Sequence, residues 1–598
     1  MNTTICHHLI EAQSRNFKQS ALKFKHRGVW NSLNWTEYFA QVQALAAALS
    51  QKGLKAGDRL AIMSCSRYEW TLFDMATMSL GAITVPIYES TTPQDLSYIL
   101  DDCKPKVLVL EDRRQLDKWL GLNSKAEFVE HIILFECGTT DNFPQKAVGL
   151  QTLLKEDPKG EDKNFNLKAH IDGLQTHVTA TIIYTSGTTG SPKGVVLTHA
   201  QIMSEVSDAF ASMGVDEKDV SLTFLPLAHV LGRVEHWGSI YWGYTLAFAE
   251  SIERLRANLN EIKPTILVAV PRIFEKIHST VSAQIQNRPP WEKHLFQQAL
   301  KLGKSSSRYK MERTPLPLYQ LPLQLAAEKW ILKSVAEAFG GRLRFAVCGG
   351  APLNPALAEF FHACGVLILE GYGLTETTAA ITVNTPFAYR FGTVGKAIGD
   401  VEIRIAEDGE ILVRSQKVMT EYYGLPEATS QVIDSEGFLA TGDVGELSPD
   451  GFLRITDRKK DLIKTSGGKY VAPQKLEGLL KLNPLIGNVL IHGDKRKFVI
   501  ALITLNEPTA AAFAREQNIS FQNFEALSQH PKIHEQIAAA VDRANSQLAS
   551  YESIKKFAVL PHDFSIERGE LTPSLKVKRS VCDERYKDII DGLYKNLT

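Results

Sequence analysis

Short apolar runs alternate with helix-period segments along much of this chain. Runs rich in Val, Ile and Leu predict strands at 58–64, 82–88, 106–110, 180–185, 221–226, 265–270, 343–350 and 366–373. Segments with apolar residues at helical spacing predict helices at 69–81, 93–103 and 271–285. Strands this apolar are typical of parallel sheets that are buried on both faces by crossover helices. The alternation therefore predicts a layered α/β fold.

The pattern changes after about residue 400. Residues 401–415 predict a hairpin that turns at Asp408-Gly409, and short strands with glycine turns continue to Lys460. A second hairpin is expected within 489–505. We therefore expect a large N-terminal domain, residues 1–458, of layered and mostly parallel α/β sheets plus a small β subdomain. A smaller α+β C-terminal domain should occupy residues 459–598.

The segment 286–324 has the least regular pattern, because it contains PP, SSS, PLP and LP. Its stretch from Arg288 to Arg313 holds seven basic residues against two acidic ones. Such a basic stretch is consistent with peripheral contact with an anionic membrane through 288–313. A solvated surface loop is the equally open alternative.

Charge and cysteine content narrow the class of protein. Lys+Arg and Asp+Glu are both 67, and this lack of net charge argues against a nucleic-acid binder. The seven cysteines form no CxxC pair, which favours neither a disulfide framework nor a zinc site. We find neither a signal-peptide pattern nor an apolar run long enough to span a bilayer. We expect a cytoplasmic protein. These features do not decide whether the protein forms a homodimer.

The stretch YTSGTTGSPKG, residues 184–194, is the first specific chemical signal. Small residues let backbone N–H groups approach an anion, hydroxyls add donors, and Lys193 would supply a positive charge. The nucleoside triphosphatase P-loop does not fit, because Pro192 precedes the lysine and Gly194 follows it. An ordinary polar turn is the alternative. The composition favours a phosphate-binding loop.

This loop resembles the phosphate loop of the adenylate-forming, AMP-producing acyl-activating enzymes. Further segments resemble motifs of that superfamily in the same order along the chain: GGAPL (349–353), EGYGLTET (370–377), TGDVGEL (441–447), DRKKDLIKTSGGKYVAP (457–473) and ELTPSLKVKR (570–579). The resemblance covers about residues 25 to 580. FLPLAHVLGR (224–233) and VPRIFEKI (270–277) look most like the long-chain fatty acyl-CoA synthetase branch.

The resemblance implies ATP, Mg²⁺ and the co-substrate coenzyme A, and it assigns residues to each. The implied nucleotide-binding residues are Thr185, Ser186, Gly187, Thr188, Thr189, Gly190, Lys193, Gly349, Gly350, Ala351, Pro352, Glu370, Gly371, Tyr372 and Asp443. Thr185 and Glu376 would ligate Mg²⁺, which prefers oxygen ligands. Thr375 would donate to the α-phosphate, Tyr372 would stack on adenine, and Asp443 would accept from the ribose hydroxyls. Without the resemblance, Glu376 also fits an acidic residue at the start of a helix, Tyr372 fits a core aromatic, and Asp443 fits a turn aspartate.

The resemblance also implies a mobile C-terminal domain that serves two half-reactions. Lys576 would be the catalytic lysine of adenylation, although Leu575 stands where the family usually has Gly, and Lys578 is a rival. Lys460 would be the hinge. The remaining implied residues around the hinge and the pantetheine channel are Arg458, Lys464, Ser466, Gly467 and Gly468. Without the resemblance, residues 458–460 would be interpreted as a charged linker. A charged linker can also serve as a hinge.

The function expected from the resemblance is ATP-dependent activation of a long-chain fatty acid to acyl-AMP, followed by transfer to coenzyme A. His229 would lie near the acyl carboxylate, although a lone histidine is more often structural. The alternatives are a fatty acyl-AMP ligase that serves a carrier protein, an aryl or short-acid CoA ligase, and a non-catalytic nucleotide-binding homologue. The simultaneous presence of Lys193, Glu376, Asp443 and Lys576 argues against the last.

Overall fold

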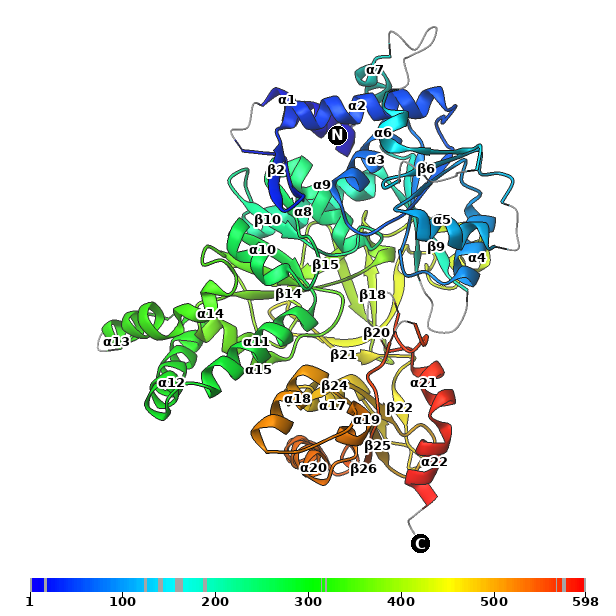
Figure 1. Cartoon of the computed structure of the whole chain (residues 1–598). Coiled ribbons are helices and arrows are strands. Elements are labelled where there is room, and N and C mark those ends of the chain that lie inside the picture. Colours follow the sequence, from blue (N-terminus) through cyan, green and yellow to red (C-terminus); the bar gives the residue numbers. More distant parts are fainter. Residues whose placement is uncertain are drawn as a thin grey trace.

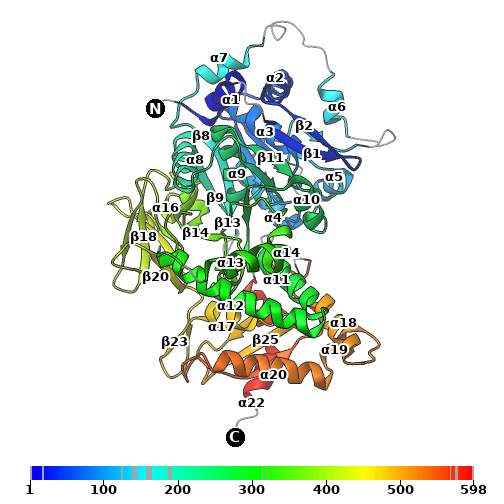
Figure 2. The same cartoon turned by 90° about the vertical axis from the view of Figure 1, so that its left-hand side faces the viewer.

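The computed structural model describes residues 3–15, 19–122, 126–137, 144–155, 165–185, 191–312, 314–317, 320–565, 567–572 and 577–595. Figure 1 shows a large body above a smaller C-terminal unit, and Figure 2 shows the same division after a quarter turn. In the described residues, the strands of the body form one nine-stranded, one eight-stranded and one four-stranded sheet, and two-stranded and three-stranded sheets follow. The fold is α/β, as the sequence predicts.

The eight-stranded sheet has the order β19-β9-β8-β4-β3-β5-β6-β7. Its strands are β19 (Glu421–Tyr422), β9 (Lys193–Thr198), β8 (Thr179–Thr185), β4 (Ile83–Ile87), β3 (Arg59–Met63), β5 (Val107–Leu110), β6 (His131–Leu134) and β7 (Ala147–Gly149). From β8 to β7 neighbouring strands run parallel, whereas β9 is antiparallel to β8 and β19 is antiparallel to β9. Because β8 and β9 are antiparallel neighbours, Tyr184 lies opposite Gly194, and the two ends of the 184–194 stretch lie side by side.

The nine-stranded sheet has the order β16-β15-β14-β13-β12-β10-β11-β1-β2. Its strands are β16 (Lys396–Ala397), β15 (Ala379–Val383), β14 (Ile368–Leu374), β13 (Phe345–Cys348), β12 (Ile266–Ala269), β10 (Val220–Thr223), β11 (Thr245–Phe248), β1 (Leu22–His26) and β2 (Val29–Leu33). The strands from β14 to β1 are parallel. In open parallel sheets, ligands bind beyond the carboxyl ends of the strands. The residues after β13 and at the end of β14 are therefore placed to bind one.

Helices cover these sheets and separate the strands along the chain. They are α1 (Ile5–Ser14), α2 (Trp35–Gln51), α3 (Tyr68–Ser79), α4 (Pro93–Cys103), α5 (Arg113–Leu120), α6 (Leu150–Leu153), α7 (Leu167–Asp172), α8 (His199–Met213), α9 (Val230–Trp242), α10 (Leu255–Ile262), α11 (Pro271–Gln286), α12 (Pro290–Glu312), α13 (Leu321–Ala326), α14 (Lys333–Glu337) and α15 (Pro355–Ala363). A π-helical turn, Ala327–Leu332, joins α13 to α14. Among the described residues, no helix combines the length and the apolar character needed to cross a membrane.

The later part of the chain contains the three smaller sheets. Their strands are β17 (Glu402–Ile405), β18 (Glu410–Arg414), β20 (Leu439–Leu447) and β21 (Leu453–Arg458), then β22 (Ile463–Lys464) and β23 (Tyr470–Val471), then β24 (Ile486–His492), β25 (Val499–Leu505) and β26 (Ile554–Val559). The remaining helices are α16 (Pro426–Ser430), α17 (Pro473–Leu480), α18 (Glu507–Glu516), α19 (Phe524–Ser528), α20 (Pro531–Asn545), α21 (Arg579–Arg585) and α22 (Lys587–Lys595). Both predicted hairpins are confirmed, because β17 pairs antiparallel with β18 and β24 with β25. The domain boundary between 458 and 459 stays a prediction.

The segment 286–324 differs from its irregular sequence pattern. Most of it is helix α12, and α12 and α13 extend from the body as an arm (Figures 1 and 2). The helix begins at Pro290, where the missing N–H costs nothing in a first turn. It packs on α15 partly through small residues: a Cβ on Gly303 would lie 2.3 Å from the carbonyl oxygen of Ala363. A contact made through Gly, Ala and Ser gives no clear apolar stripe in the sequence.

Glu235 in α9 provides a pH-dependent test of the core. The side chain is buried, accepts a hydrogen bond from Ser221 Oγ, and burial raises its pKa to about 7. Between about pH 4.5 and 7 the folded protein keeps a proton that the unfolded chain releases, so the free energy of unfolding falls by about 3 kcal/mol as pH rises through this range. The uncharged variant Glu235→Gln should lose this part of the pH dependence.

The measurement is the melting temperature of the wild type and of Glu235→Gln from pH 5 to pH 8. The variant should gain stability relative to the wild type as the pH rises. Glu407→Gln, at an exposed turn, serves as the matched control and should follow the wild type. Parallel pH curves for the wild type and Glu235→Gln would contradict the assignment.

Candidate active site

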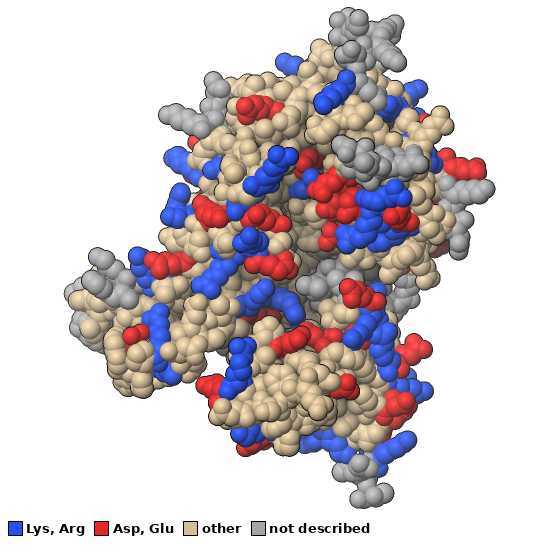
Figure 3. All heavy atoms as spheres, in the orientation of Figure 1, with Lys and Arg blue, Asp and Glu red and all other residues tan. Residues whose placement is uncertain are grey.

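A cleft of about 4680 Å³ separates the body from the C-terminal unit and continues into the body. Figure 3 shows this face of the molecule with both signs of charge distributed over it. Fifteen of the predicted residues line the cleft: Thr185, Lys193, His229, Gly349, Gly350, Ala351, Pro352, Glu370, Gly371, Tyr372, Thr375, Glu376, Asp443, Arg458 and Lys460. Residues from six separate motif segments therefore meet at one place.

Two predicted elements lie outside the described residues. They are the centre of the phosphate loop, Ser186–Gly190, and the lysine Lys576. The residues that flank Lys576 are described, and Thr572, Val577 and Lys578 line the cleft. An isolated bridge between Leu571 and Val577 brings the two sides of this segment together. The C-terminal segment thus faces the same cleft as the nucleotide motifs.

Asp443 is held by two donors that the sequence had assigned to separate roles. One carboxylate oxygen accepts a hydrogen bond from the Tyr372 hydroxyl at 2.7 Å, and the other accepts from Arg458 Nε at 3.0 Å. The carboxylate lies in β20, the tyrosine in β14 and the arginine at the end of β21. Burial and the nearby Asp443 raise the pKa of Tyr372, so the hydroxyl remains a donor. Each oxygen retains acceptor capacity for a ligand hydroxyl.

Glu370, also in β14, is a buried carboxyl group at the wall of the cleft. One of its oxygens accepts a hydrogen bond from the backbone N–H of Leu353 at 3.1 Å, and burial raises its pKa to about 7. This bond ties the 349–353 segment to β14. Gly350 has a φ of +80°, in the left-handed region that glycine enters without strain. The two motifs predicted to border adenine therefore form one wall.

Glu376 lies in a single 3₁₀ turn, Thr375–Thr377, that joins β14 to β15. The chain continues as a strand, so Glu376 does not open an α-helix. Tyr422 of β19 donates a hydrogen bond from its hydroxyl to Glu376 Oε1 at 2.9 Å. Lys193 Nζ lies 4.8 Å from the centre of the Tyr422 ring. Sequence reasoning missed Tyr422, because its position depends on the pairing of β19 with β9.

His229 caps the N-terminus of α9 and also lines the cleft. Its Nδ1 accepts a hydrogen bond from the backbone N–H of Leu231 at 3.1 Å. An accepting Nδ1 leaves Nε2 as the protonated nitrogen of the neutral ring. The histidine therefore has a structural role as the cap of α9. Its place beside an acyl carboxylate stays a prediction.

The remaining predicted residues lie apart from the cleft. Lys464 ends β22, and Ser466, Gly467 and Gly468 form the turn to β23; this hairpin is exposed. Gly468 has a φ of +75°. Contacts between body and C-terminal unit are instead made by other residues: Asn354 Nδ2 donates to the Gly478 carbonyl at 3.2 Å, and an Arg272 guanidinium nitrogen lies 3.9 Å from an Asp563 carboxylate oxygen. Among the described residues, Leu571, Thr572 and residues 577–579 therefore line the cleft, whereas the glycine turn does not.

Comparison with known proteins agrees with this layered α/β body. The family model described as AMP-binding enzyme matches residues 10–423, and the model described as AMP-binding enzyme C-terminal domain matches residues 460–598. The chain belongs to the AMP-binding enzyme family. It is 35% identical over 571 residues to the long-chain-fatty-acid–CoA ligase FadD15 of Mycobacterium bovis, a match that covers 95% of this chain and 93% of the relative. It is 29% identical to the mouse long-chain-fatty-acid–CoA ligase ACSBG1, covering 98% and 85%.

Solved structures support the fold. The anthranilate CoA ligase AuaEII in complex with anthranoyl-AMP matches with a TM-score of 0.75 and 19% identity, covering 99% of this chain and 98% of that one. The o-succinylbenzoate CoA synthetase of Bacillus subtilis, in complex with ATP and magnesium ion, matches with a TM-score of 0.66 and 21% identity, covering 96% and 98%. At such low sequence identities, this likeness shows a shared fold and carries no conclusion about function.

Proposed function

We propose that this chain is an ATP-dependent ligase that converts a long-chain fatty acid to acyl-AMP and then to acyl-CoA. The observation that supports the proposal is that one cleft is lined both by the side chains predicted to bind the nucleotide and by an apolar wall. That wall consists of Ala209, Phe210 and Met213 of α8, Val230, Leu231 and Val234 of α9, and Ala379, Ala380 and Val383 of β15. Each methylene buried there would contribute about 0.8 kcal/mol.

In the first half-reaction a carboxylate oxygen of the acid attacks the α-phosphorus of ATP. The bond from that phosphorus to the oxygen bridging to the β-phosphate breaks, and pyrophosphate leaves. Both reactants are anions, so positive charge and fixed positions supply most of the catalysis. Lys193 and Lys576 supply that charge, Thr375 donates to the α-phosphate, and Asp443 accepts from the ribose. The wall formed by Gly349–Pro352 and Glu370 borders adenine.

The residues at the phosphate end of the cleft fit Mg²⁺. The ion prefers a small number of protein oxygens together with phosphate oxygens. Among the described residues, only Tyr422 donates to the Glu376 carboxylate, and it occupies one oxygen. Glu376 and the Thr185 hydroxyl would hold the ion, which when bound neutralises phosphate charge. These are the assignments that sequence resemblance suggested, and the geometry is compatible with them.

In the second half-reaction the thiolate of coenzyme A attacks the acyl carbon, the bond from that carbon to the AMP oxygen breaks, and AMP leaves. We propose that rotation about Lys460 exchanges the 570–579 segment for the glycine turn Ser466–Gly468 at the cleft. Lys464 would accompany that turn. Glycine suits a segment that must approach a ligand closely. Closure of this kind also keeps water away from the adenylate.

The test is product analysis with purified protein, ATP, Mg²⁺, coenzyme A and acids of increasing chain length. Acyl-CoA and AMP should form, with the highest rate for long-chain acids. Acyl-AMP that accumulates without acyl-CoA would indicate a carrier-protein acceptor. A preference for an aryl or short acid would overturn the assignment of the apolar wall.

We also propose that the arm formed by α12 and α13 contacts anionic membrane surfaces. The pattern of exposure on α13 is inverted: Leu321, Leu323 and Leu325 are 44%, 57% and 57% exposed, whereas the polar Gln324 is 5% exposed. The neighbouring α12 exposes basic side chains, namely Lys301, Lys304, Arg308 and Lys310. Apolar side chains that enter the lipid and basic ones that face the headgroups complement such a surface.

Flotation with lipid vesicles tests this contact. The triple variant Leu321→Ser/Leu323→Ser/Leu325→Ser should lose binding to all vesicles. Lys301→Gln/Lys304→Gln/Arg308→Gln should lose only the added binding that phosphatidylglycerol confers, about 1 kcal/mol per charge at low salt. Activity on a soluble short acid serves as the control for folding. Unchanged flotation of both variants would dismiss the membrane contact.

A further inference from the structure

Residues 415–422, which link β18 to β19, contact the turn that carries Glu376. The backbone N–H of Met419 donates to the Glu376 carbonyl at 2.7 Å. The Thr378 hydroxyl donates to the Lys417 carbonyl, also at 2.7 Å. This segment is therefore bonded both to the backbone of the 3₁₀ turn and to the residue that follows the turn. None of the recognised motifs includes it.

The same segment contacts the strand that carries Lys193. Its last two residues form β19, in which Tyr422 lies opposite Val195 of β9. Tyr422 is 7% exposed, so its ring is fixed by packing. The ring lies against the Lys193 ammonium group, while the hydroxyl reaches Glu376. One side chain thus contacts both charged groups at the phosphate end of the cleft.

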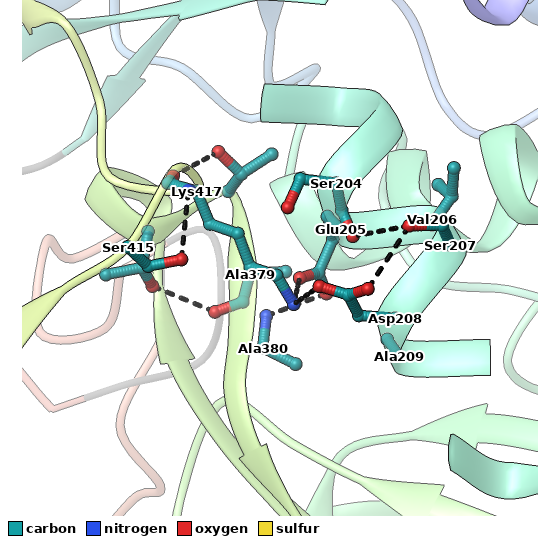
Figure 4. A network of polar contacts seen from close by, with 12 residues as sticks. Ser204, Glu205, Val206, Ser207, Asp208, Ala209, Ala379, Ala380, Ser415 and Lys417 are labelled. Carbon is teal, nitrogen blue, oxygen red and sulfur yellow. Dashed lines mark hydrogen bonds and ion pairs between the residues drawn. The ribbon is translucent and has the colours of Figure 1, made fainter. Parts of the chain in front are cut away.

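Lys417 anchors the start of the segment inside the protein (Figure 4). Its Nζ lies 3.4 Å from Glu205 Oε2 and 3.2 Å from Asp208 Oδ2, and its side chain is fully buried. Glu205 also accepts a hydrogen bond from the Ala380 backbone N–H at 2.9 Å. Because a buried charge is costly to leave unpaired, this ion pair holds the 415–422 segment and β15 in one arrangement.

The chemistry of Tyr422 suits a group that holds two opposite charges apart. A carboxylate and an ammonium group in one cleft would otherwise pair with each other, and each would lose its attraction for a ligand. The aromatic face binds the ammonium group without a compensating charge. The hydroxyl binds one carboxylate oxygen and leaves the other. Burial and the adjacent Glu376 raise the pKa of Tyr422, so the hydroxyl keeps its proton.

We propose that Tyr422 is a positioning residue which, on a segment anchored by Lys417, holds Glu376 and Lys193 at the separation required by a metal-bound nucleotide. This inference rests on the metal role proposed for Glu376. Fixing both side chains before the nucleotide arrives removes part of the ordering cost of binding. Tyr422 touches no reacting atom, so its effect should appear in the dependence on Mg²⁺ and not in the binding of the fatty acid.

The experiment measures single-turnover pyrophosphate release without coenzyme A, as a function of Mg²⁺ concentration. Tyr422→Phe keeps the ring beside Lys193 and removes the bond to Glu376. Loss of a charge-assisted hydrogen bond should raise the half-saturating Mg²⁺ concentration about tenfold. The KM for the fatty acid and the melting temperature should stay at wild-type values. Tyr422→Leu also frees Lys193 and should lower the maximal rate as well.

Two comparisons make the outcome decisive. Tyr423→Phe is the matched control and should leave the Mg²⁺ dependence unchanged. Glu376→Gln should shift it at least as strongly as Tyr422→Phe. If Glu376→Gln shifts the Mg²⁺ dependence and Tyr422→Phe does not, the positioning role is overturned while the metal role stands. If Glu376→Gln itself has no effect, the metal role fails. A Tyr422→Phe variant that loses stability and fatty-acid binding together has only a structural role.

Discussion

Replacement of Lys576 by alanine should strongly slow acyl-adenylate formation and spare thioester formation from preformed acyl-AMP. The rate of the first half-reaction should fall by about 10²–10³-fold, the usual effect of removing one preorganised group that stabilises transition-state charge. The second half-reaction should proceed at the wild-type rate, because the lysine then lies away from the acyl carbon. The measurement is pyrophosphate release for the first step and acyl-CoA formation from synthetic acyl-AMP for the second.

Lys578 supplies the matched control for this prediction. It lies two residues further along the same segment, and among the described residues it lines the cleft. Its backbone N–H donates to the Glu570 carbonyl at 2.8 Å, and it forms the N-cap of α21. Lys578→Ala should keep most of the adenylation rate. The assignment would be wrong if Lys578→Ala removed adenylation and Lys576→Ala did not, or if Lys576→Ala slowed both steps equally.

Replacement of Asp443 by alanine should weaken the binding of ATP selectively. Hydrogen bonds to a charged group contribute about 1.5–3 kcal/mol, so the KM for ATP should rise about 10–100-fold. The KM for the fatty acid should not change, because the apolar wall lies elsewhere in the cleft. Asp443→Asn, which keeps one acceptor oxygen, should give a smaller increase.

Nucleotide analogues separate a ribose contact from general damage to the Tyr372–Asp443–Arg458 network. The wild type should discriminate against 2′-deoxy-ATP or 3′-deoxy-ATP, and Asp443→Ala should bind these analogues as well as it binds ATP. Asp450→Ala, which breaks an exposed ion pair with Arg390, controls for loss of a carboxylate in the turn between β20 and β21. A variant that discriminates as strongly as the wild type would exclude the ribose contact.

The α/β part of the fold was predictable because its strands are buried on both faces. The prediction of a helix at 93–103 agrees with α4, and the predicted strand at 106–110 agrees with β5, whose four residues are all buried. Helix α12 was not predictable from an apolar stripe. It begins at the second proline of a Pro-Pro pair, contains a run of three serines, and contacts α15 through Gly303 and Ser307. The exposure of the leucines on α13 could not be predicted either, because it depends on what packs around this helix in the folded protein.

The convergence of the recognised motifs on one cleft was predictable from the resemblance. The motifs around Lys193, Glu376 and Asp443 come together at the cleft, although the strands that carry them belong to three different sheets. The bonds among them could not be read from the sequence. Tyr372 was expected as an adenine contact and is also the donor to Asp443. Tyr422 reaches Glu376 only because β19 joins the edge of the eight-stranded sheet beside β9. Such contacts depend on strand pairing between distant segments, which periodicity does not specify.

The most direct test of the account is a rapid-quench experiment in which coenzyme A is withheld and then added. With ATP, Mg²⁺ and oleate alone, the protein should form one bound oleoyl-AMP and release one pyrophosphate per active site. Later addition of coenzyme A should convert that intermediate to oleoyl-CoA and free AMP without further ATP. Formation of ADP and phosphate, or of oleoyl-CoA with no preceding oleoyl-AMP, would contradict a single cleft that serves both half-reactions.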